Sequence, residues 1–375
     1  MLKIDEGFRS ISLQQKIMKR VGYLWKDVCS MDNIQKAITM SSKHKTKRRE
    51  VKRVLNNRDF YAEEIHKMLL TTDIKWGEDR YESRVEPSSK KERELSIPNY
   101  YPDLIIQWAI VLVIEKTIRK GMCDCCVGSV PKRGPLVGKK RVEKWLNKDK
   151  KIKYIEKLDI RHFFQNVDVE VMKKQFRRKI KDPVLLSVLD EILDRGSRNT
   201  GKGLPIGYYT SQWFSNFCLE RLDHVILEEC TPRHYIRYVD DIVIMDSNKR
   251  KLREIKNRID KELETIGLSL KDNWQIFKKH SRPLDFLGYR FYDGYVLLRK
   301  RILIHMFRLA RRFHKQHKKA VQTARALMSL LGWLKHVDNG PALYEKSIKE
   351  LAPTGLLKAV ISNYDKAHRI TPVIA

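Results

Sequence analysis

The sequence predicts a mixed α/β (α+β) fold built from two or three structural units. Hydrophobic residues make up 42% of the 375 residues and aromatic residues 9%, which is enough for a buried core. Apolar residues recur at helical spacing in the first 75 residues, whereas short strand-like runs occupy the middle of the chain. At roughly 100 to 200 residues per domain, the length favours more than one unit.

The predicted elements follow one another with short connections. Helical spacing covers most of 1–75 and returns over 102–120, after a polar and then extended segment over 79–98. The stretch 121–140 is rich in Gly and Pro, so we expect a loop there. The remaining predictions are a strand over 153–158, helices over 169–181, 183–193 and 210–229, a loop over 195–207, strands over 235–237 and 242–245, a helix over 248–266, and strands over 286–291 and 295–298.

The net charge indicates a polyanionic partner. Subtracting 46 Asp and Glu from 77 Lys and Arg leaves +31, and nucleic acid is the first candidate ligand for such a surface. The apolar content argues against a disordered basic tail. A surface that is simply well solvated is the alternative.

The positive charge is concentrated in two regions. Residues 43–58 contain eight Lys or Arg and one acid, Glu50, and residues 299–335 contain no acid. Apolar residues recur at helical spacing from residue 301 onwards, so this segment should bury one face and expose its cations. We expect the exposed face to contact nucleic acid through Arg299, Lys300, Arg301, Arg308, Arg311 and Arg312.

The sequence gives no sign of secretion or of membrane insertion. No run approaches the ~20 apolar residues of a membrane helix, and the first residues lack an apolar signal core. We therefore expect a cytoplasmic protein without a membrane partner. The six cysteines form no regular disulfide framework, and the group Cys123, Cys125 and Cys126 lacks the second ligand pair of a zinc site, so we expect reduced thiols.

Three acids stand at the ends of strand-like runs. Asp159 follows the run 155–158, and Asp240 with Asp241 separates two apolar runs in RYVDDIVIM. Adjacent carboxylates between apolar strands repel each other unless a cation lies beside them. Oxygen ligands of this kind suit a pair of Mg²⁺ ions that could support nucleotidyl transfer, with Mn²⁺ as a substitute. An exposed Asp-Asp turn is the alternative.

These residues lie within a set of motifs that resembles a known family. KLDIRHFFQNVD, GLPIGYYTSQWFSNFCL, YVDD and FLGYR occur in this order and resemble motifs A, B, C and E of reverse transcriptases. The resemblance implies a right-hand polymerase with fingers, palm and thumb. We expect a basic helical region with the fingers over 1–150, the palm over 151–298 and a basic helical thumb over 299–375.

The resemblance also implies roles for individual residues. Asp159, Asp240 and Asp241 would be the catalytic residues and would hold two Mg²⁺ ions, together with the backbone carbonyl of Ile160. Phe164 matches the aromatic residue that excludes a 2′-hydroxyl, although core packing is the alternative. The remaining expected contacts are Lys91, Arg93, Ile206, Gly207 and Gln212 with the incoming dNTP, and Tyr238, Phe286, Leu287, Gly288 and Tyr289 with nucleic acid.

Motif B points to a subgroup. Many reverse transcriptases have Pro-Gln-Gly here, whereas this chain has Pro205-Ile206-Gly207, within an IGxxxSQ pattern. The pattern is similar to that of reverse transcriptases from diversity-generating retroelements, which copy a template RNA with errors at adenines. Loss of an amide beside the nucleotide would lower the penalty for a misplaced pair.

The expected function is RNA-directed DNA synthesis on a dedicated, structured noncoding or template RNA in a bacterial or phage-encoded system. The expected partners are this RNA, the cDNA and RNA–DNA duplex, dNTPs and a small basic accessory protein. The alternatives are an anti-phage defence reverse transcriptase, templated or template-independent, and a catalytically idle RNA-binding scaffold. A group II intron maturase is a weaker alternative.

Overall fold

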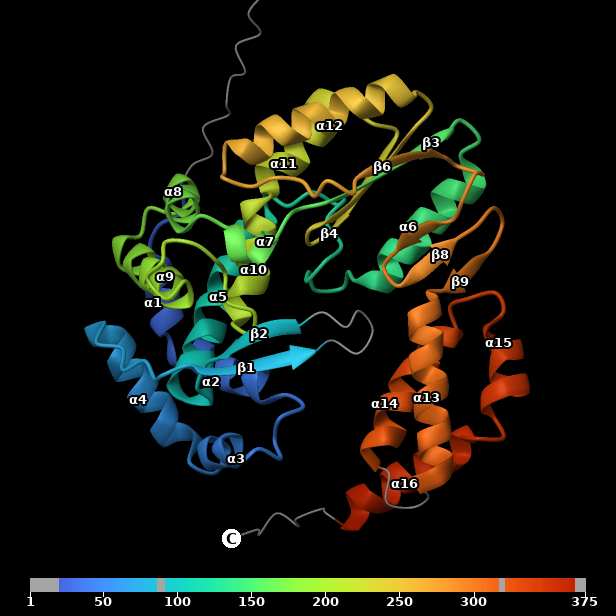
Figure 1. Ribbon diagram of the computed structural model, residues 1–375. Helices are drawn as coiled ribbons and strands as arrows, with labels where there is room; N and C mark the ends of the chain where they lie inside the picture. The colour runs from blue at the N-terminus through green and yellow to red at the C-terminus, as the bar shows by residue number, and fades with distance from the viewer. Residues whose placement is uncertain (1–19, 86–91, 317–320, 368–375) are drawn as a thin grey trace, which may run out of the picture. The chain divides into compact units, whose positions relative to one another are not determined.

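The computed structural model describes residues 20–85, 92–316 and 321–367 (Figure 1). The chain forms two compact units, neither of which is continuous in sequence. Unit 1 contains the described parts of 1–76, 100–120 and 169–201, and unit 2 contains those of 77–99, 121–168 and 202–375. The division into fingers, palm and thumb as three successive segments stays a prediction.

Unit 1 is helical and is organised around α5. This helix is apolar on most sides, and residues such as Ile106 and Ile110 are fully buried. The carboxylate of Asp182 caps α9 by accepting from the Leu185 N–H, and it also accepts from the Trp25 N–H at 2.9 Å, which ties α9 to α1. The elements are α1 (Leu24–Cys29), α2 (Met31–Ser42), α3 (Arg49–Asn56), α4 (Arg58–Thr71), the kinked turn η1 (Tyr100–Leu104), α5 (Ile105–Arg119), α8 (Val169–Lys179) and α9 (Pro183–Gly196).

Unit 2 contains a four-stranded antiparallel sheet in the order β4-β5-β3-β6. The central strands β3 and β5 are largely buried, as their apolar residues require. The elements are β3 (Tyr154–Asp159), β4 (His234–Tyr238), β5 (Asp241–Asp246) and β6 (Gln275–Lys278), with the helical segments α7 (Phe163–Asn166), α10 (Tyr209–Cys218), α11 (Glu220–His224), η2 (Val225–Cys230) and α12 (Lys249–Glu264).

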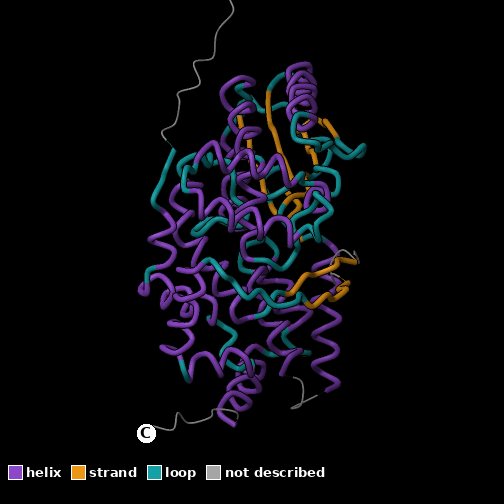
Figure 2. The backbone as a smooth tube through the Cα atoms, turned by 90° about the vertical axis from the view of Figure 1, so that its left-hand side faces the viewer, coloured by secondary structure: helices purple, strands orange, loops and turns teal. Residues whose placement is uncertain are grey.

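Two smaller antiparallel sheets and the C-terminal helices complete unit 2; strands and helices are distinguished by colour in Figure 2. One hydrophobic core runs from the large sheet through β7–β9 to the C-terminal helices and includes Ile155, Phe286, Met306 and Leu327. The elements are β1 (Arg80–Val85), β2 (Glu92–Ile97), α6 (Pro135–Lys148), β7 (Leu284–Phe286), β8 (Tyr289–Phe291), β9 (Val296–Leu298), α13 (Lys300–Gln316), α14 (Val321–Leu334), α15 (Gly340–Leu343), η4 (Tyr344–Ile348) and α16 (Thr354–Ala367).

The mixed α/β prediction is confirmed, but several elements differ from it, including the predicted strand 286–291, which is split into β7 and β8, and the short helix α7, which was not predicted. The end of the predicted loop 121–140 is helical because Gly134 and Pro135 start α6, whose residues Val142 and Leu146 are buried. The predicted helix 210–229 is broken into α10, α11 and η2. Strand β6 was not predicted, since four residues carry too little periodic signal.

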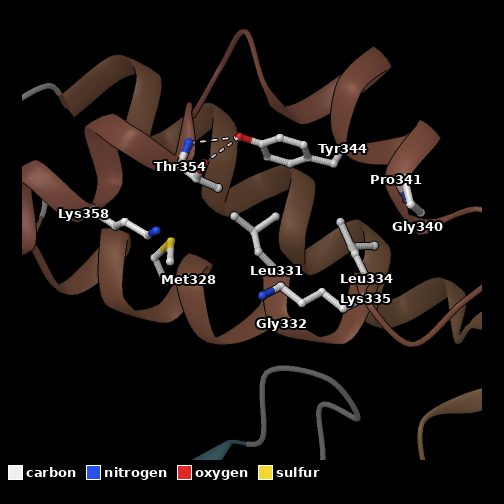
Figure 3. A pocket seen from close by; sticks show the side chains of 10 residues that line it. All are labelled: Met328, Leu331, Gly332, Leu334, Lys335, Gly340, Pro341, Tyr344, Thr354 and Lys358. Carbon is white, nitrogen blue, oxygen red and sulfur yellow. Dashed lines mark hydrogen bonds between the residues drawn. The ribbon is translucent and has the colours of Figure 1, made fainter.

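The C-terminal helices line an open pocket, a cavity of about 360 Å³ (Figure 3). Its lining is mostly apolar, with Leu331 on α14 and Lys358 on α16 among the residues. The Tyr344 hydroxyl accepts from the Thr354 N–H at 3.0 Å and so fixes the start of α16. None of the three predicted catalytic aspartates lines this cavity. Within the described ranges, no helix is both long and apolar enough to cross a membrane.

Candidate active site

The three predicted catalytic aspartates lie together in unit 2. Asp159 ends β3, Asp241 begins β5, and the two residues are opposite each other in the antiparallel register. Asp240 lies in the turn between β4 and β5, and its carbonyl accepts from the Ile160 N–H at 3.3 Å. The strand register therefore brings together carboxylates that are about eighty residues apart in sequence.

Burial and mutual repulsion raise the pKa of two of these carboxyl groups. Burial is the main cause of the raised pKa of Asp240, and the negative charge of Asp159 adds to it. Burial likewise raises the pKa of Asp241 to about 7, with Asp159 and Asp240 contributing against the opposing effect of Lys157. The site therefore disfavours uncompensated negative charge.

Two lysines form ion pairs with the aspartates. Lys271 forms an ion pair with Asp159, and its N–H donates to the Asp159 carbonyl at 2.8 Å. The Lys157 Nζ lies 3.7 Å from the Asp241 Oδ1 and donates to the Asp285 carbonyl at 2.7 Å. Neither lysine was among the predicted site residues. Lys157 could have been found, because it shares a strand face with Asp159, whereas Lys271 is distant in sequence and gives no local signal.

The carboxylates fit a magnesium site in their chemistry. Across the described part of the chain, no three His, Cys, Asp or Glu side chains are arranged as a ready metal cluster. The Asp241 Oδ1 is nevertheless buried and accepts no hydrogen bond, which leaves a carboxylate oxygen for a cation. Oxygen donors of this kind are the ligands that Mg²⁺ prefers.

A groove of about 680 Å³ opens beside Asp159. Strands β3 and β6, the segment around β7 and the start of α13 line it. Most of the charged residues in its lining are basic: Lys157, Arg282, Arg290, Arg299, Lys300 and Arg301. The structure thus brings three predicted nucleic-acid contacts, Arg299 to Arg301, into one groove with a predicted catalytic aspartate.

Phe164 lies in α7, shortly after Asp159. Its ring is half-buried and makes an edge contact with Phe163, the two centroids being 5.5 Å apart. The Phe164 carbonyl accepts from the Leu204 N–H at 2.6 Å, so this segment is tied to the motif B loop. Because the ring is only half-buried, it is placed for either contact with a sugar or partial packing.

The motif B loop contacts strand β2 directly. The Ser96 N–H donates to the Ile206 carbonyl at 2.9 Å. Gly207 has a φ of +133°, and a Cβ there would lie 2.1 Å from the Ser96 carbonyl oxygen, so only glycine fits without a shift. The hydroxyl of buried Tyr208 donates to Asp79 at 2.7 Å, which fixes the loop on its other side.

The other predicted nucleotide contacts are placed as follows. Arg93 on β2 is exposed, and its charge acts on the Asp240 carboxyl by lowering its pKa, although burial dominates. Gln212 is exposed on α10, and Ile206 is half-buried. Lys91 lies outside the described residues. Of these predicted nucleotide contacts, Arg93 therefore has an electrostatic effect on a predicted catalytic aspartate, Asp240.

The turn 286–289, which was predicted to contact nucleic acid, lies mostly in the core. Phe286, Leu287 and Tyr289 are buried, so their side chains pack inside unit 2, while Tyr238 is half-buried. Gly288 has a φ of +83°, and a Cβ there would meet the Trp333 ring at 2.9 Å. The structure therefore explains this glycine by packing against α14. Contact with nucleic acid through the backbone of the turn stays a prediction.

Helix α13 has the predicted amphipathic character. Met306, Ala310 and Phe313 are buried in the core, whereas the cations Arg301, Arg308, Arg311 and Arg312 are exposed. Arg299, just before the helix, is partly exposed and pairs with Asp285 at 2.7 Å. The six cysteines, all within the described ranges, form no disulfide bond.

Comparison with known proteins gives relatives for both sequence and fold. The chain is 27% identical over 146 residues to the retron Ec73 reverse transcriptase of Escherichia coli, a match that covers 36% of this chain and 45% of that protein. The chain thus spans about half the length of this relative.

Solved structures of telomerase from Candida tropicalis are also similar. The apo enzyme matches with a TM-score of 0.50 at 13% identity, over 78% of this chain and 58% of that chain, which supports the right-hand polymerase fold. A form lacking the C-terminal domain matches with a TM-score of 0.42 at 14% identity, over 60% and 55%.

A family model matches the part of the chain that carries the predicted site. The model of the family "Reverse transcriptase (RNA-dependent DNA polymerase)" matches residues 86–291, which include all three aspartates and the motif B loop. The expected enzyme class, an RNA-directed DNA polymerase, is the class that this family comprises. Since the matched stretch is more than half of the chain, the protein belongs to the reverse transcriptase family.

Proposed function

We propose that the protein is an RNA-directed DNA polymerase that extends a primer on an RNA template. The observation that carries the proposal is the convergence of Asp159, Asp240 and Asp241 beside a groove lined by basic residues. The acidic group suits metal-assisted nucleotidyl transfer, and the cations suit the phosphates of a template–primer duplex.

Two Mg²⁺ ions, or Mn²⁺ in their place, would be held by the three aspartates and the backbone carbonyl of Ile160. Such ions neutralise the charge that develops on the attacking and leaving oxygens. Lys271 and Lys157 pair with two of these carboxylates, those of Asp159 and Asp241. Their long side chains can withdraw when another cation binds, so the lysines would keep the acidic group stable before substrate arrives.

The chain offers candidates for binding the nucleotide. The Arg93 guanidinium suits the triphosphate, because its planar donors can bind phosphate oxygens in pairs. Phe164 would meet the sugar and disfavour a 2′-hydroxyl. Gly207 would keep the motif B loop against β2, where the Ser96 carbonyl leaves no room for a Cβ.

The site assignment is tested with Asp159→Asn and Asp240→Asn. Each should abolish primer extension with Mg²⁺ while leaving RNA binding in a filter assay largely intact, because the cations are unchanged. Asp272→Asn is the matched control, because Asp272 is an exposed aspartate that pairs with Arg161, and its substitution changes the net charge by the same amount. Retained synthesis by either site variant would overturn the assignment.

Templated synthesis has to be separated from its alternatives. Purified protein is incubated with each dNTP, with and without a defined RNA. Products that follow the RNA sequence support the proposal, whereas addition without RNA indicates a template-independent polymerase. Absence of any product, with RNA still bound, indicates a scaffold that has kept the fold.

We further propose that the template is a dedicated structured RNA. The segment between α2 and α3 carries a crowded group of cations, where burial and the nearby Arg48 lower the pKa of Lys45. Such crowding is relieved by a polyanion. The proposal predicts that the protein prefers its cognate RNA to a plain primer–template of equal length. Equal affinity for the two would contradict it.

The proposed biological setting is a diversity-generating retroelement. Ile206 would replace an amide near the nucleotide, so Ile206→Gln should lower misincorporation opposite template adenines. Sequencing the cDNA made by each protein measures this, and an unchanged error spectrum would remove the support from motif B. A small basic accessory protein and a cytoplasmic location belong to the same proposal.

Anti-phage defence is the second candidate, and similarity to a retron reverse transcriptase is compatible with it. The flanking DNA distinguishes the two settings. A near-repeat pair that differs mainly at adenines indicates diversification, and a structured noncoding RNA beside defence genes indicates immunity.

A further inference from the structure

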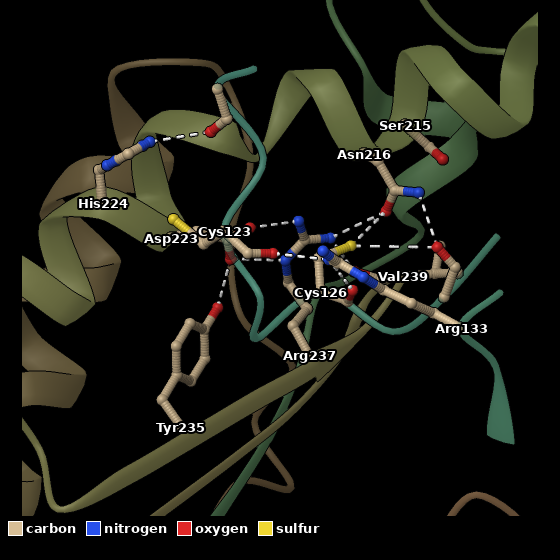
Figure 4. Close-up of polar contacts among 12 residues, drawn as sticks. Cys123, Cys126, Arg133, Ser215, Asn216, Asp223, His224, Tyr235, Arg237 and Val239 are labelled. Carbon is tan, nitrogen blue, oxygen red and sulfur yellow. Dashed lines mark hydrogen bonds and ion pairs between the residues drawn. The ribbon is translucent and has the colours of Figure 1, made fainter. Parts of the chain in front are cut away.

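Strand β4 carries a fully buried arginine immediately before the YVDD turn. Arg237 is 0% exposed, among the largest buried side chains of the described chain. A buried guanidinium is unfavourable unless its donors are paired. Its Nε and Nη2 donate to Asp223 at 2.7 and 2.5 Å, and its Nη1 donates to the Val239 carbonyl at 2.9 Å (Figure 4).

The partners of Arg237 are themselves held in place. Asp223 is 1% exposed and also accepts from the Tyr235 hydroxyl at 2.6 Å. Asn216 accepts from the Arg237 Nη1 at 3.3 Å and donates to the Gly128 carbonyl at 2.8 Å. The guanidinium therefore joins α10, α11 and the segment around Gly128 to the turn.

The turn that Arg237 contacts is strained. Val239 has a φ of +57°, a left-handed conformation that β-branched residues rarely adopt. The turn also has no spare room at Gly128, because a Cβ there would lie 2.7 Å from the Val239 nitrogen. Asp240 and Asp241 follow directly, so a relaxed Val239 would change the direction of both carboxylates.

We propose that Arg237 is a positioning residue for the catalytic aspartates. Its hydrogen bond to the Val239 carbonyl, anchored by the buried pair with Asp223, keeps Val239 left-handed and fixes where Asp240 and Asp241 point. The proposal rests on the proposed function, because it assigns a consequence for catalysis to this geometry. It differs from a purely structural role, in which the pair would only stabilise the fold.

The two roles are separated by replacing the buried polar group as a whole. Arg237→Met alone would leave Asp223 buried and unpaired, and the protein could fail to fold for that reason. The test variant therefore combines Arg237→Met with Asp223→Leu and Tyr235→Phe, and is called the apolar variant. Replacing a buried ion pair by apolar residues of similar size often leaves stability unchanged.

The experiment is a cycle with Val239→Gly in the wild-type and apolar backgrounds. Glycine adopts the left-handed conformation without strain. The apolar variant should lose about 100-fold in kcat, the usual cost of misplacing a reacting group by about 1 Å, with the KM for dNTP nearly unchanged. Adding Val239→Gly should recover about tenfold, which corresponds to about 1.4 kcal/mol and matches the cost of a left-handed residue.

Amide hydrogen exchange of peptides that span 238–241 gives a readout independent of activity. Exchange should be faster in the apolar variant and slower again when Val239→Gly is added. The proposal would be overturned if Val239→Gly changed kcat by the same factor in both backgrounds. It would also be overturned if the apolar variant kept the kcat and the exchange rates of the wild type.

If the apolar variant does not fold, Arg237→Lys takes its place in the same cycle, because lysine keeps the charge but cannot reach Asp223 and Val239 together. If Asp240→Asn retains synthesis, the proposed function fails, while the exchange data still decide whether Arg237 holds the turn.

Discussion

Glu156 lies on β3, the strand that ends at Asp159, and is opposite Ile244 on β5 and Ile276 on β6. It is 0% exposed, and neither carboxylate oxygen has a hydrogen-bond partner. Burial raises its pKa from 4.5 to about 8, against the opposing effect of Lys256, which is itself paired with Asp260 at 2.5 Å. Glu156 is therefore protonated in the folded protein at neutral pH.

The sign of the effect on stability follows from the raised pKa. Between pH 4.5 and about 8 the unfolded chain releases this proton and the folded protein keeps it, so stability falls as pH rises through that window. At about 1.4 kcal/mol per pH unit within that window, the cost is about 1.4 kcal/mol at pH 5.5 and about 4.6 kcal/mol at pH 8.5, a difference of about 3 kcal/mol. Glu156→Gln removes the titration and should remove this difference.

Urea unfolding at pH 5.5 and pH 8.5 measures the prediction. Relative to wild type, Glu156→Gln should gain about 3 kcal/mol in unfolding free energy between the two pH values. Glu254→Gln, on the exposed side of α12, controls for the change in net charge. The same pH dependence in Glu156→Gln and wild type would refute the account of Glu156 as a buried, protonated carboxyl group.

Three further predictions concern the site and its surroundings. Gly207→Ala should displace the motif B loop from Ser96, so primer extension should fall at least about tenfold with a higher KM for dNTP, and wild-type kinetics would contradict the clash at 2.1 Å. Phe164→Ala should raise incorporation of ribonucleotides at least about tenfold relative to deoxynucleotides, and unchanged selectivity in a competition assay would return Phe164 to core packing. Among the cysteines, Cys123 should react first with iodoacetamide at pH 7.5. A hydrogen bond from Cys125 lowers the pKa of Cys123, whereas burial raises the pKa of Cys218 to about 12. Mass spectrometry that shows Cys218 modified before Cys123 would contradict this prediction.

The fold was predictable where apolar residues recur with a clear helical or strand period, or where turn residues clearly interrupt that period. The helical pattern of α13 and the apolar runs around Asp240 and Asp241 gave the correct elements. The prediction of a loop up to residue 140 was wrong, because Pro135 begins helix α6 and a proline can begin a helix as readily as it ends one. Local composition does not say which of the two a proline does.

The site was predictable where residues follow one another in a motif and not where they meet through the fold. Asp159 and the YVDD turn could be paired because their motifs occur in a recognisable order. Lys271 reaches Asp159 only because its segment runs beside the end of β3, with the Lys271 N–H bonded to the Asp159 carbonyl. No spacing in the sequence encodes that contact.

Several departures from local preference meet at one turn of this protein. Val239 is β-branched and left-handed, Arg237 is charged and fully buried, and the pKa values of Asp240 and Asp241 are raised. Each is unfavourable alone, and a sequence selected only for stability would avoid all of them. Because they occur together beside Asp159, we infer that this turn lowers the stability of the fold and in return holds the carboxylates close together. A cation that binds between those carboxylates would relieve their repulsion, so the same geometry that weakens the fold favours metal binding.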